Sequence, residues 1–471
     1  NFEYDFIEAF NIKLTRDAEI DIDNDISKSF VEKISKGLKD RKKGQPVRLV
    51  YDNTISPDLL DFIMKKIKFK KDDHPIPGGR YHNFKDFISF PNIGNPELSY
   101  KKIVPLKHPD LKDQPTLFKI IKKKDVLITY PYQSFDHLID LLREASIDPC
   151  VKNVKITLYR VAKNSNIVKA LINALKNGKE VTAVVELQAR FDEESNIYWA
   201  NKLQEEGAKV IYGVPGLKVH SKMFIISRKE NNSLVKYAHI GTGNFNGDTA
   251  KIYTDHSLLT ADKRITEEVE KVFAFYADNL KTGSYDHLLV SPFFMRKELV
   301  KLINTEIKNA LNKKEAYIIL KLNNLVDVDM IKKLYEASSK GVKIKMIIRG
   351  TCSLVAGVKG MSDNIEAISV IDKFLEHSRL FIFCNGGKEK YFLSSADWMT
   401  RNLDHRSEVA VPIYDKAIQQ HLREIMDTLW SDNTKARVLG VKQNNEYRVL
   451  KNDIHVRAQE KIYNLLKPRK T

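Results

Sequence analysis

The chain has 471 residues, and its contents of 42% hydrophobic and 9% aromatic residues are those of a globular protein with packed cores rather than a disordered chain. At about 150 residues per domain, this length favours about three domains. The 78 Lys and Arg residues outnumber the 61 Asp and Glu residues by 17, which favours a polyanionic partner such as nucleic acid, phospholipid or a polyphosphorylated molecule.

Cysteine content and hydropathy indicate the cellular compartment in which the protein works. The three cysteines, Cys150, Cys352 and Cys384, have neither metal-ligand nor redox-motif spacing, so a reducing compartment without disulfides is expected. No apolar run approaches the ~20 residues needed to cross a bilayer, and no signal-peptide pattern opens the chain. We expect a cytoplasmic protein, and its basic charge is compatible with peripheral association at the inner face of the membrane. The chain opens on Asn rather than Met, so a missing upstream segment is also expected.

Residues 1–106 are expected to form a partial upstream α/β domain. The apolar spacing predicts strands and helices in alternation, at 11–22, 25–44, 46–52 and 56–67, with Pro57 in the first turn of the second helix. A stretch rich in Gly, Pro and Asn follows, and the segment 106–118 is typical of a linker. A domain boundary is therefore placed near residue 107.

Beyond this boundary, strand and helix patterns alternate, as they do in α/β proteins with parallel sheets. The predicted elements are strands at 154–161, 180–190, 209–213 and 219–226, with helices at 166–179 and 195–209. A comparable order recurs from EAYIILKL at 315–322 to HSRLFIF at 377–383, which indicates an internal repeat. Two α/β domains of the same fold are predicted, at 107–287 and 288–471.

The repeat carries an unusual pair of residues at the head of an apolar run in each half. His220 is followed two positions later by Lys222, and His377 by Arg379, so each pair is predicted to project from one face of a single strand. Neutral histidine can attack phosphorus, and a neighbouring cation can stabilise the charge that spreads over the phosphate oxygens. The pattern therefore favours phosphate chemistry.

Two loops lie about 153 positions apart and strengthen this interpretation. In GTGNFN, small residues allow backbone N–H groups to approach an anion, and Asn244 is available to orient a histidine or a phosphate. The corresponding loop SSADWM offers Asp397, which we treat as a supporting residue together with Arg379.

The duplicated H-x-K pattern resembles the phospholipase D-like superfamily, whose two motifs meet at a domain interface. This resemblance implies an α/β fold of two tandem phospholipase D-like domains after the partial upstream α/β domain. In that superfamily an Asp usually follows H-x-K after four further residues, whereas Ser227 and Cys384 stand at those positions here. The difference argues against a standard phosphodiesterase.

A wider set of segments resembles polyphosphate kinases of the phosphohistidine type, over nearly the whole chain. These segments are TLYRVAKNSNIVKALINAL, VVELQARFDEESNIYWA, PGLKVHSKMFIISRKE, AHIGTGNFN, YTDHSLLTAD and FLSSADWMTRNLDHR. The resemblance implies reversible transfer of the terminal phosphate of ATP, through a phosphohistidine, to inorganic polyphosphate, with release of ADP. It also implies that a helical N-terminal domain of that family precedes this chain.

The same resemblance implies roles for individual residues. The phosphorylated residue would be His220, and His377 would protonate or steady the leaving phosphate. Arg160 and Arg190 match the family's Mg²⁺–phosphate site, where arginine, having no lone pair, would bind nucleotide phosphates beside the metal. Lys222 and Asn244 would belong to the same phosphate site. The ATP contacts would be Tyr253, Arg349 and His377.

The predicted partners are ATP or ADP with Mg²⁺ and inorganic polyphosphate, and a homo-oligomer is expected. No aromatic-interleaved RNA motif is present, so no specific nucleic-acid partner is expected. Two other functions stay open, a phospholipase D-like phosphodiesterase and a non-catalytic scaffold that binds polyanions. Ion pairing with the acidic residues at 192–194 is the alternative role for Arg190.

Overall fold

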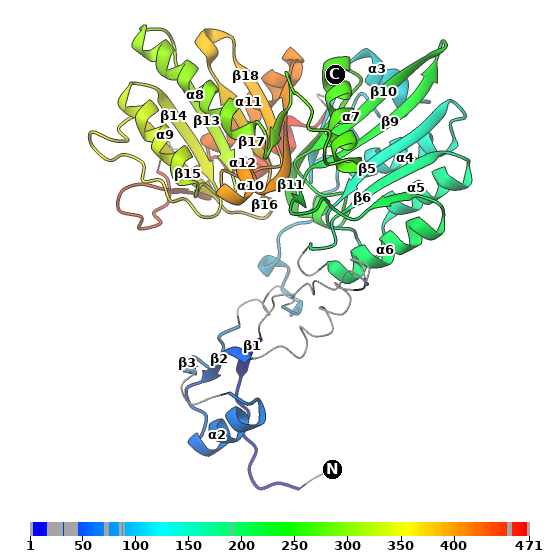
Figure 1. Ribbon diagram of the computed structural model, residues 1–471. Coiled ribbons are helices and arrows are strands. Elements are labelled where there is room, and N and C mark those ends of the chain that lie inside the picture. The colour runs from blue at the N-terminus through cyan, green and yellow to red at the C-terminus, as the bar shows by residue number, and fades with distance from the viewer. Residues whose placement is uncertain are drawn as a thin grey trace. The chain divides into compact units, whose positions relative to one another are not determined.

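The computed structural model describes residues 3–16, 32, 46–69, 75–83, 87, 90–189, 192–449 and 455–468. These residues fall into two compact units, Asn1–Lys101 and Lys102–Thr471 (Figure 1).

The first unit contains a small sheet of three strands in the order β1-β2-β3. Its elements are β1 (Ile12–Arg16), β2 (Pro46–Asp52), α2 (Pro57–Lys66), β3 (Ile76–Gly78) and the 3-10 turn η3 (Pro96–Leu98). The predictions of a strand at 46–52 and of a helix with Pro57 in its first turn are confirmed, and the Ser56 side chain caps that helix. The helix predicted at 25–44 lies almost entirely outside the described residues.

The second unit is built on two large sheets that follow the predicted repeat. The first has the order β16-β11-β10-β9-β5-β6-β7, with β4 beside β11. Its strands are β4 (Val126–Tyr130), β5 (Val151–Leu158), β6 (Glu180–Val185), β7 (Lys209–Ile211), β9 (Lys222–Glu230), β10 (Ser233–Gly241) and β11 (Tyr253–Thr260). Its helices are α3 (Leu117–Lys123), α4 (Asp136–Ile147), α5 (Asn166–Lys176), α6 (Glu193–Glu205) and α7 (Lys263–Ala277), with the turn η4 (Thr249–Lys251).

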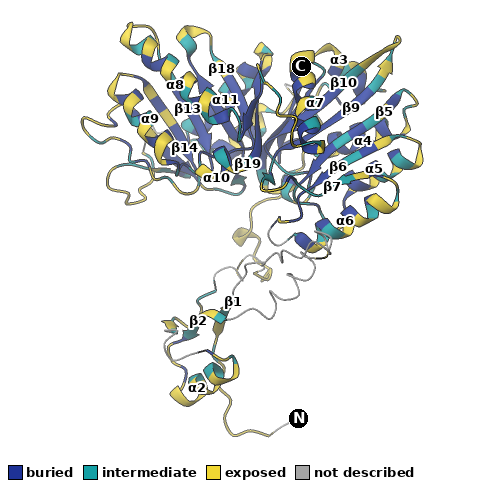
Figure 2. Ribbon diagram, viewed as in Figure 1, coloured by how far each residue is buried: buried dark blue, intermediate teal, exposed yellow. Residues whose placement is uncertain are grey.

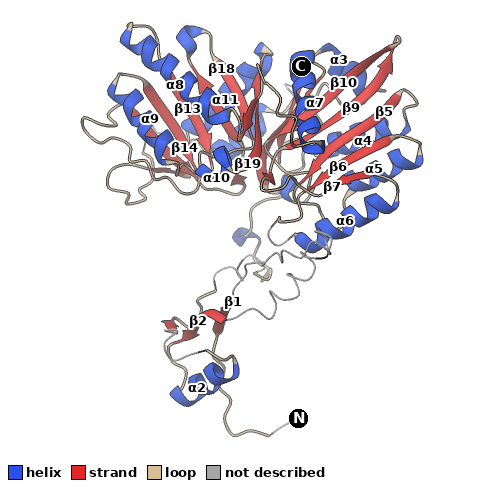
Figure 3. Ribbon diagram, viewed as in Figure 1, coloured by secondary structure: helices blue, strands red, loops and turns tan. Residues whose placement is uncertain are grey.

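The second large sheet has the order β12-β19-β18-β17-β13-β14-β15-β20, with β8 beside β19. Its strands are β12 (Leu289–Ser291), β13 (Tyr317–Leu322), β14 (Lys343–Ile348), β15 (Ile365–Val370), β17 (Arg379–Phe383), β18 (Lys390–Ser394), β19 (Arg406–Ile413) and β20 (Ala436–Val438). Its helices are α8 (Met295–Leu311), α9 (Val328–Ser339), α10 (Thr400–Asp404), α11 (Lys416–Trp430) and α12 (Ala458–Leu465), with the turn η5 (Asn385–Gly387). Figure 3 shows how helices flank both sheets.

Each large sheet is mixed rather than parallel throughout. The strands β5, β6 and β7 are parallel, as predicted, and so are β13, β14 and β15. The next strand, β9, pairs antiparallel with β5, so the expectation of a parallel sheet is wrong for this part. It returns through a tight hairpin to β10, at Asn231 and Asn232, whose positive φ values of 45° and 62° suit a two-residue turn.

The predicted single strand at 219–226 is wrong, because it is interrupted at its second and third residues. The chain forms β8 (Lys218–Val219), leaves the strand at His220 and Ser221, and resumes as β9. The short strand β8 pairs with β19 of the second sheet. In the same way β16 (Leu375–Glu376) pairs with β11 of the first sheet before the chain continues as β17. Each half thus adds a short strand to the sheet of the other half. The interruption after that short strand is where the chain passes from one sheet to the other.

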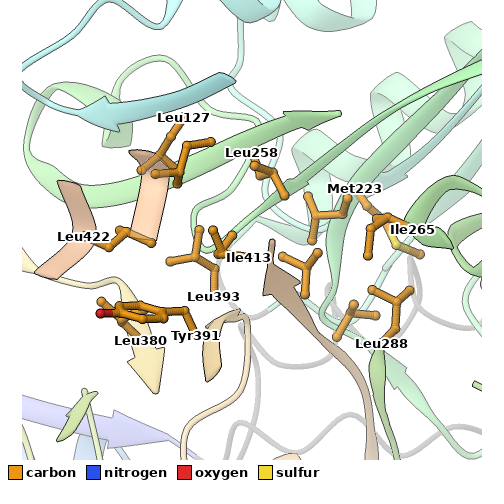
Figure 4. Packing of buried hydrophobic residues seen from close by; sticks show 14 of the residues in the cluster. Leu127, Met223, Leu258, Ile265, Leu288, Leu380, Tyr391, Leu393, Ile413 and Leu422 are labelled. Atoms are coloured by element: carbon orange, nitrogen blue, oxygen red, sulfur yellow. The ribbon is translucent and has the colours of Figure 1, made fainter. Parts of the chain in front are cut away.

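A shared hydrophobic core joins the two halves of the second unit. Along β17, Leu380 and Ile382 face this core, while Phe381 and Phe383 face a second core under α8 and α9, as strand alternation requires. Figure 4 shows Leu127 and Leu258 of the first sheet packed near Leu393 and Ile413 of the second, and Figure 2 shows the strands as the buried layer. At about 2–5 kcal/mol per buried leucine truncated to alanine, this continuous core fixes the two halves as one body.

Candidate active site

His220 lies at the break between β8 and β9, where its strand has crossed to the second sheet. Its backbone N–H donates to the carbonyl of Ser407 at 2.9 Å. The ring of Tyr159, the residue after β5, packs edge-on against the imidazole with ring centroids 4.7 Å apart. The side chain is only 12% exposed.

The Nδ1 atom of His220 lies 2.8 Å from the carboxylate of Glu408, which is fully buried on β19. Burial by itself raises the pKa of Glu408, but His220 and Lys222 outweigh it and leave this pKa below its ordinary value. Burial lowers the pKa of His220 to about 3, although Glu408 acts in the opposite direction. A neutral imidazole beside a carboxylate must place its proton on Nδ1, so Nε2 keeps its lone pair.

His377 occupies the equivalent break between β16 and β17 and has an equivalent carboxylate. Its Nδ1 atom lies 2.9 Å from both oxygens of Asp255, a buried residue of β11. The hydroxyl of Thr242 donates to Asp255 at 2.6 Å. Burial lowers the pKa of His377, as do Arg379 and Lys222, whereas Asp255 raises it. His377 is therefore also neutral, with its proton on Nδ1.

The two predicted cations, Lys222 and Arg379, are both buried between the halves. Arg379 donates through Nε and Nη2 to Asp397 at 3.2 and 3.3 Å, and its Nη1 lies 3.3 Å from Nε2 of His377. The Nζ of Lys222 donates to the carbonyl of His220. Burial lowers the pKa of Lys222, as does Arg379, while Glu408 and Asp255 raise it.

These mutual effects place the two histidine–carboxylate pairs in one electrostatic neighbourhood. Lys222 of the first half acts on the pKa of His377 of the second, and Glu408 of the second half acts on the pKa of Lys222. The exchanged strands give the geometry of this arrangement, because β8 brings His220 beside Glu408 of β19 and β16 brings His377 beside Asp255 of β11.

Two further predicted residues lie beside His377. The ring of Tyr253 contacts the His377 imidazole with centroids 5.0 Å apart. Arg349 follows β14 and donates from Nε to the carbonyl of Glu376 at 3.1 Å. Burial lowers the pKa of Arg349, and the positive charge of Arg379 lowers it further.

Asn244 stands 153 positions before Asp397 and is its counterpart in the first loop. Its Oδ1 atom is buried and has no hydrogen-bond partner among the described residues. A buried amide oxygen without a partner is costly, so a donor is expected at this position in the working protein.

Of the two arginines predicted for the Mg²⁺–phosphate site, the structure describes Arg160 but not Arg190. Arg160 is partly exposed and forms an ion pair with Asp192, with Nη1 2.6 Å from Oδ2. Arg190 lies outside the described residues, so its prediction stays a prediction. Among the described residues, no cluster of three or more His, Cys, Asp or Glu side chains could hold a metal ion.

Sequence reasoning missed Asp255 and Glu408, although both stand in segments that carried the resemblance or bordered it. Superimposing the two halves with the loop offset of 153 positions would have aligned YTDHS with RSEVA, and so Asp255 with Glu408. Each histidine is thus oriented by a carboxylate that the opposite half supplies. Arg406 was also missed, and its charge lowers the pKa of His220.

The fold and the site first define a class. The chain contains two tandem α/β repeats, which exchange the short strands that precede their two histidines. The prediction of an α/β fold with two tandem domains is confirmed. Three family models match consecutive parts of the chain, namely the polyphosphate kinase middle domain over 2–90, C-terminal domain 1 over 116–282 and C-terminal domain 2 over 288–459.

Similar proteins agree with the family models. The chain is 49% identical to the polyphosphate kinase of Escherichia coli K12 over 99% of its own length and 68% of that protein. It is also 49% identical to the enzyme of Vibrio parahaemolyticus, over 99% and 67%. The crystal structure of the Porphyromonas gingivalis polyphosphate kinase aligns with a TM-score of 0.84 and 35% identity, over 98% of this chain and 67% of that one. The chain belongs to the polyphosphate kinase family, as predicted.

Proposed function

We propose that this chain transfers the terminal phosphate of ATP, through phosphorylated His220, to inorganic polyphosphate, and that the reaction is reversible. The observation that supports this most strongly is the buried contact between Glu408 and Nδ1 of His220. It commits the imidazole proton to Nδ1 and leaves Nε2 as the nucleophile.

In the first step, the Nε2 lone pair of His220 attacks the γ-phosphorus of ATP in line with the leaving oxygen. The new N–P bond forms as the bond between the γ-phosphorus and the bridging oxygen breaks, and ADP leaves with the electron pair. The Nδ1 proton stays with the imidazole, and Glu408 stabilises the positive charge that develops there. In the second step, a terminal oxygen of polyphosphate attacks the phosphohistidine and restores His220.

The proposed role of His377 is to hold or protonate the leaving phosphate. In the structure its Nε2 is within reach of Arg379 and acts as an acceptor. A polyanionic phosphate raises the pKa of a nearby imidazole, because opposite charge favours the protonated form. Substrate binding would thus convert His377 into a donor, and Asp255 would fix its ring.

The cations around the pair would bind the phosphates of Mg²⁺–ATP, with Mg²⁺ entering as part of the nucleotide substrate. Lys222, whose Nζ contacts the His220 carbonyl, and Arg379, whose Nη1 lies beside Nε2 of His377, would share the charge of the transferred group. Arg349 and Tyr253 would contact the nucleotide beside His377. Arg160 and Arg190 would bind the nucleotide phosphates. Asn244, whose Oδ1 lacks a partner, would complete the phosphate site.

We also propose how the enzyme binds polyphosphate, its oligomeric state and its location in the cell. The net charge of +17 supports binding of polyphosphate through release of counterions. A homo-oligomer, a cytoplasmic location and peripheral contact with the membrane are consistent with this charge and with the cysteine content. Within the described ranges the structure contains no helix with the length and apolar character of a membrane span.

The test is phosphorylation of the full-length natural protein by γ-³²P-labelled ATP with Mg²⁺. Label on protein that survives alkali but not acid is expected, and His220→Ala should abolish it. The exposed His405 is a matched control, since it lies close to the motifs in sequence, and His405→Ala should label normally.

Three outcomes would contradict the proposal. Label that persists in His220→Ala would move the nucleophile elsewhere. Hydrolysis of a phosphodiester without nucleotide would favour the phosphodiesterase alternative. Polyphosphate binding without any label on the wild-type protein would favour the scaffold.

A further inference from the structure

The segment immediately before His377 is held by the start of the last helix, α12, which is far from it in sequence. Arg457 forms a bidentate ion pair with Asp372, with Nε and Nη2 at 2.8 and 2.6 Å from the two carboxylate oxygens. The Asp372 side chain is fully buried. Such a two-point contact fixes direction as well as distance.

Gln459 forms the second part of this contact and is itself 97% buried, with 3% exposure. Its Oε1 accepts the backbone N–H of Phe374 at 2.9 Å, and its Nε2 donates to the Phe374 carbonyl at 2.8 Å. The same Nε2 donates to Oε1 of Glu376 at 2.7 Å. One amide thus uses three hydrogen bonds to hold Phe374 and Glu376, which flank Leu375 in and just before strand β16, and His377 follows directly after this strand.

Glu376 extends the contact into the first sheet and towards the site. Its second oxygen, Oε2, accepts from Thr254 at 2.9 Å and from the buried Lys321 at 3.0 Å. Lys321 also donates to Ser378, the residue after His377, at 2.9 and 3.1 Å. His377 is therefore bounded on both sides by residues of one buried network.

The helix α12 is seated firmly enough to serve as the fixed end of this network. The backbone N–H of Ala458 donates to Asp432 at 2.7 Å, and Ala458 and Ile462 belong to the core shared by the two halves. The strand before His220 is held differently, since Glu186 accepts the Val219 N–H at 2.8 Å. The contact with α12 thus holds the segment before His377, whereas the segment before His220 is held by Glu186.

We infer that Gln459, supported by Arg457, is a positioning residue for His377, and that α12 sets the place of this histidine in the phosphotransfer site. This inference rests on the function proposed for His377. The Nδ1 contact to Asp255 and the Nε2 contact to Arg379 can be made together only while the backbone at Glu376 is fixed. A displacement of about 1 Å in such a group can cost about 100-fold in rate.

The test is a double-mutant cycle between Gln459→Leu and His377→Gln in the full-length protein, with kcat for polyphosphate synthesis as the measurement. Gln459→Leu should lower kcat at least ~10-fold, because leucine keeps the volume and removes all three hydrogen bonds. In the His377→Gln background the same substitution should change kcat less than about 2-fold. Lys461→Ala, on the exposed side of α12, should leave kcat unchanged.

A second measurement does not depend on phosphotransfer. Carbethoxylation of His377 by diethyl pyrocarbonate, followed by peptide mass spectrometry, should be several-fold faster in Gln459→Leu, while the rate at His220 stays the same. Arg457→Lys, which loses the bidentate geometry but keeps the charge, should give a smaller change in the same direction.

Two results would overturn the inference: an equal loss of kcat in both backgrounds, or an unchanged rate of His377 modification. Absence of phosphoprotein in the wild type would overturn the proposed function alone, because the modification rates would still report whether Gln459 positions His377. If Gln459→Leu does not fold, Arg457→Lys supplies both measurements.

Discussion

At the scale of single residues, the two histidines are neutral because they are buried, and each is oriented by a carboxylate. The two carboxylates are not held alike. Glu408 accepts from Ser395 at 2.5 Å and from Asn402 at 2.7 Å, whereas the described side-chain contacts of Asp255 are to Thr242 and His377. The more completely held pair is the one that contains the proposed nucleophile.

Replacing Glu408 by Gln tests this orientation. The amide keeps the shape but removes the charge that fixes the Nδ1 proton and stabilises the phosphohistidine. We expect the single-turnover rate of labelling by γ-³²P-labelled ATP, measured by rapid quench, to fall by about 10²- to 10⁴-fold. Ser395→Ala, which leaves the carboxylate in place, should lose about 10-fold or less. A wild-type rate in Glu408→Gln would show that the carboxylate does not orient the nucleophile.

At the scale of elements, the loop after β10 is shaped by the carboxylate it encloses. A Cβ atom at Gly243 would lie 2.5 Å from Oδ2 of Asp255, closer than any real contact. A Cβ at Gly247 of the same loop would meet only Phe135, at an ordinary 3.6 Å. The first glycine is therefore needed for the approach of the loop to the site.

Gly243→Ala should displace Asp255 and with it the ring of His377, so kcat for polyphosphate synthesis should fall at least about 10-fold. The matched variant Gly247→Ala should keep a nearly wild-type kcat. Circular dichroism establishes that both variants are folded. Equal activity in the two variants would mean that the loop tolerates a side chain beside Asp255.

At the scale of the whole molecule, several histidines are buried as neutral groups, and this makes stability depend on pH. Burial lowers the pKa to about 3 for His220, His239 and His256, and to about 4 for His108. The unfolded chain takes up protons on these groups at about pH 6.5, before the folded chain does. Stability is therefore expected to fall as pH falls from about 6.5 towards 4.

His239 offers the clearest test, because burial dominates its pKa shift and no carboxylate contributes. Below pH 6.5, each buried neutral histidine lowers the free energy of unfolding by about 1.4 kcal/mol per pH unit, or about 2 kcal/mol between pH 6.5 and 5. The free energy of unfolding in urea, measured at pH 7, 6 and 5, should decrease, and His239→Gln should reduce the slope by this amount. The same slope in both proteins would rule out His239 as a titrating group in unfolding.

The sequence by itself determined the α/β class and the repeat, and it singled out both candidate histidines with their neighbouring cations. These features lie in short windows, where periodicity, spacing and motif are legible. It could not determine the breaks at His220 and His377, since an apolar run with period two looks the same whether it stays in one sheet or crosses to another.

Only the tertiary structure decided which acid orients which histidine. Glu408 lies 188 residues from His220, and Asp255 lies 122 residues from His377. Gln459 is likewise 83 residues from Glu376. A hydrogen bond across such a separation leaves no trace in local periodicity, because it exists only once the two sheets have packed on their shared core and exchanged β8 and β16.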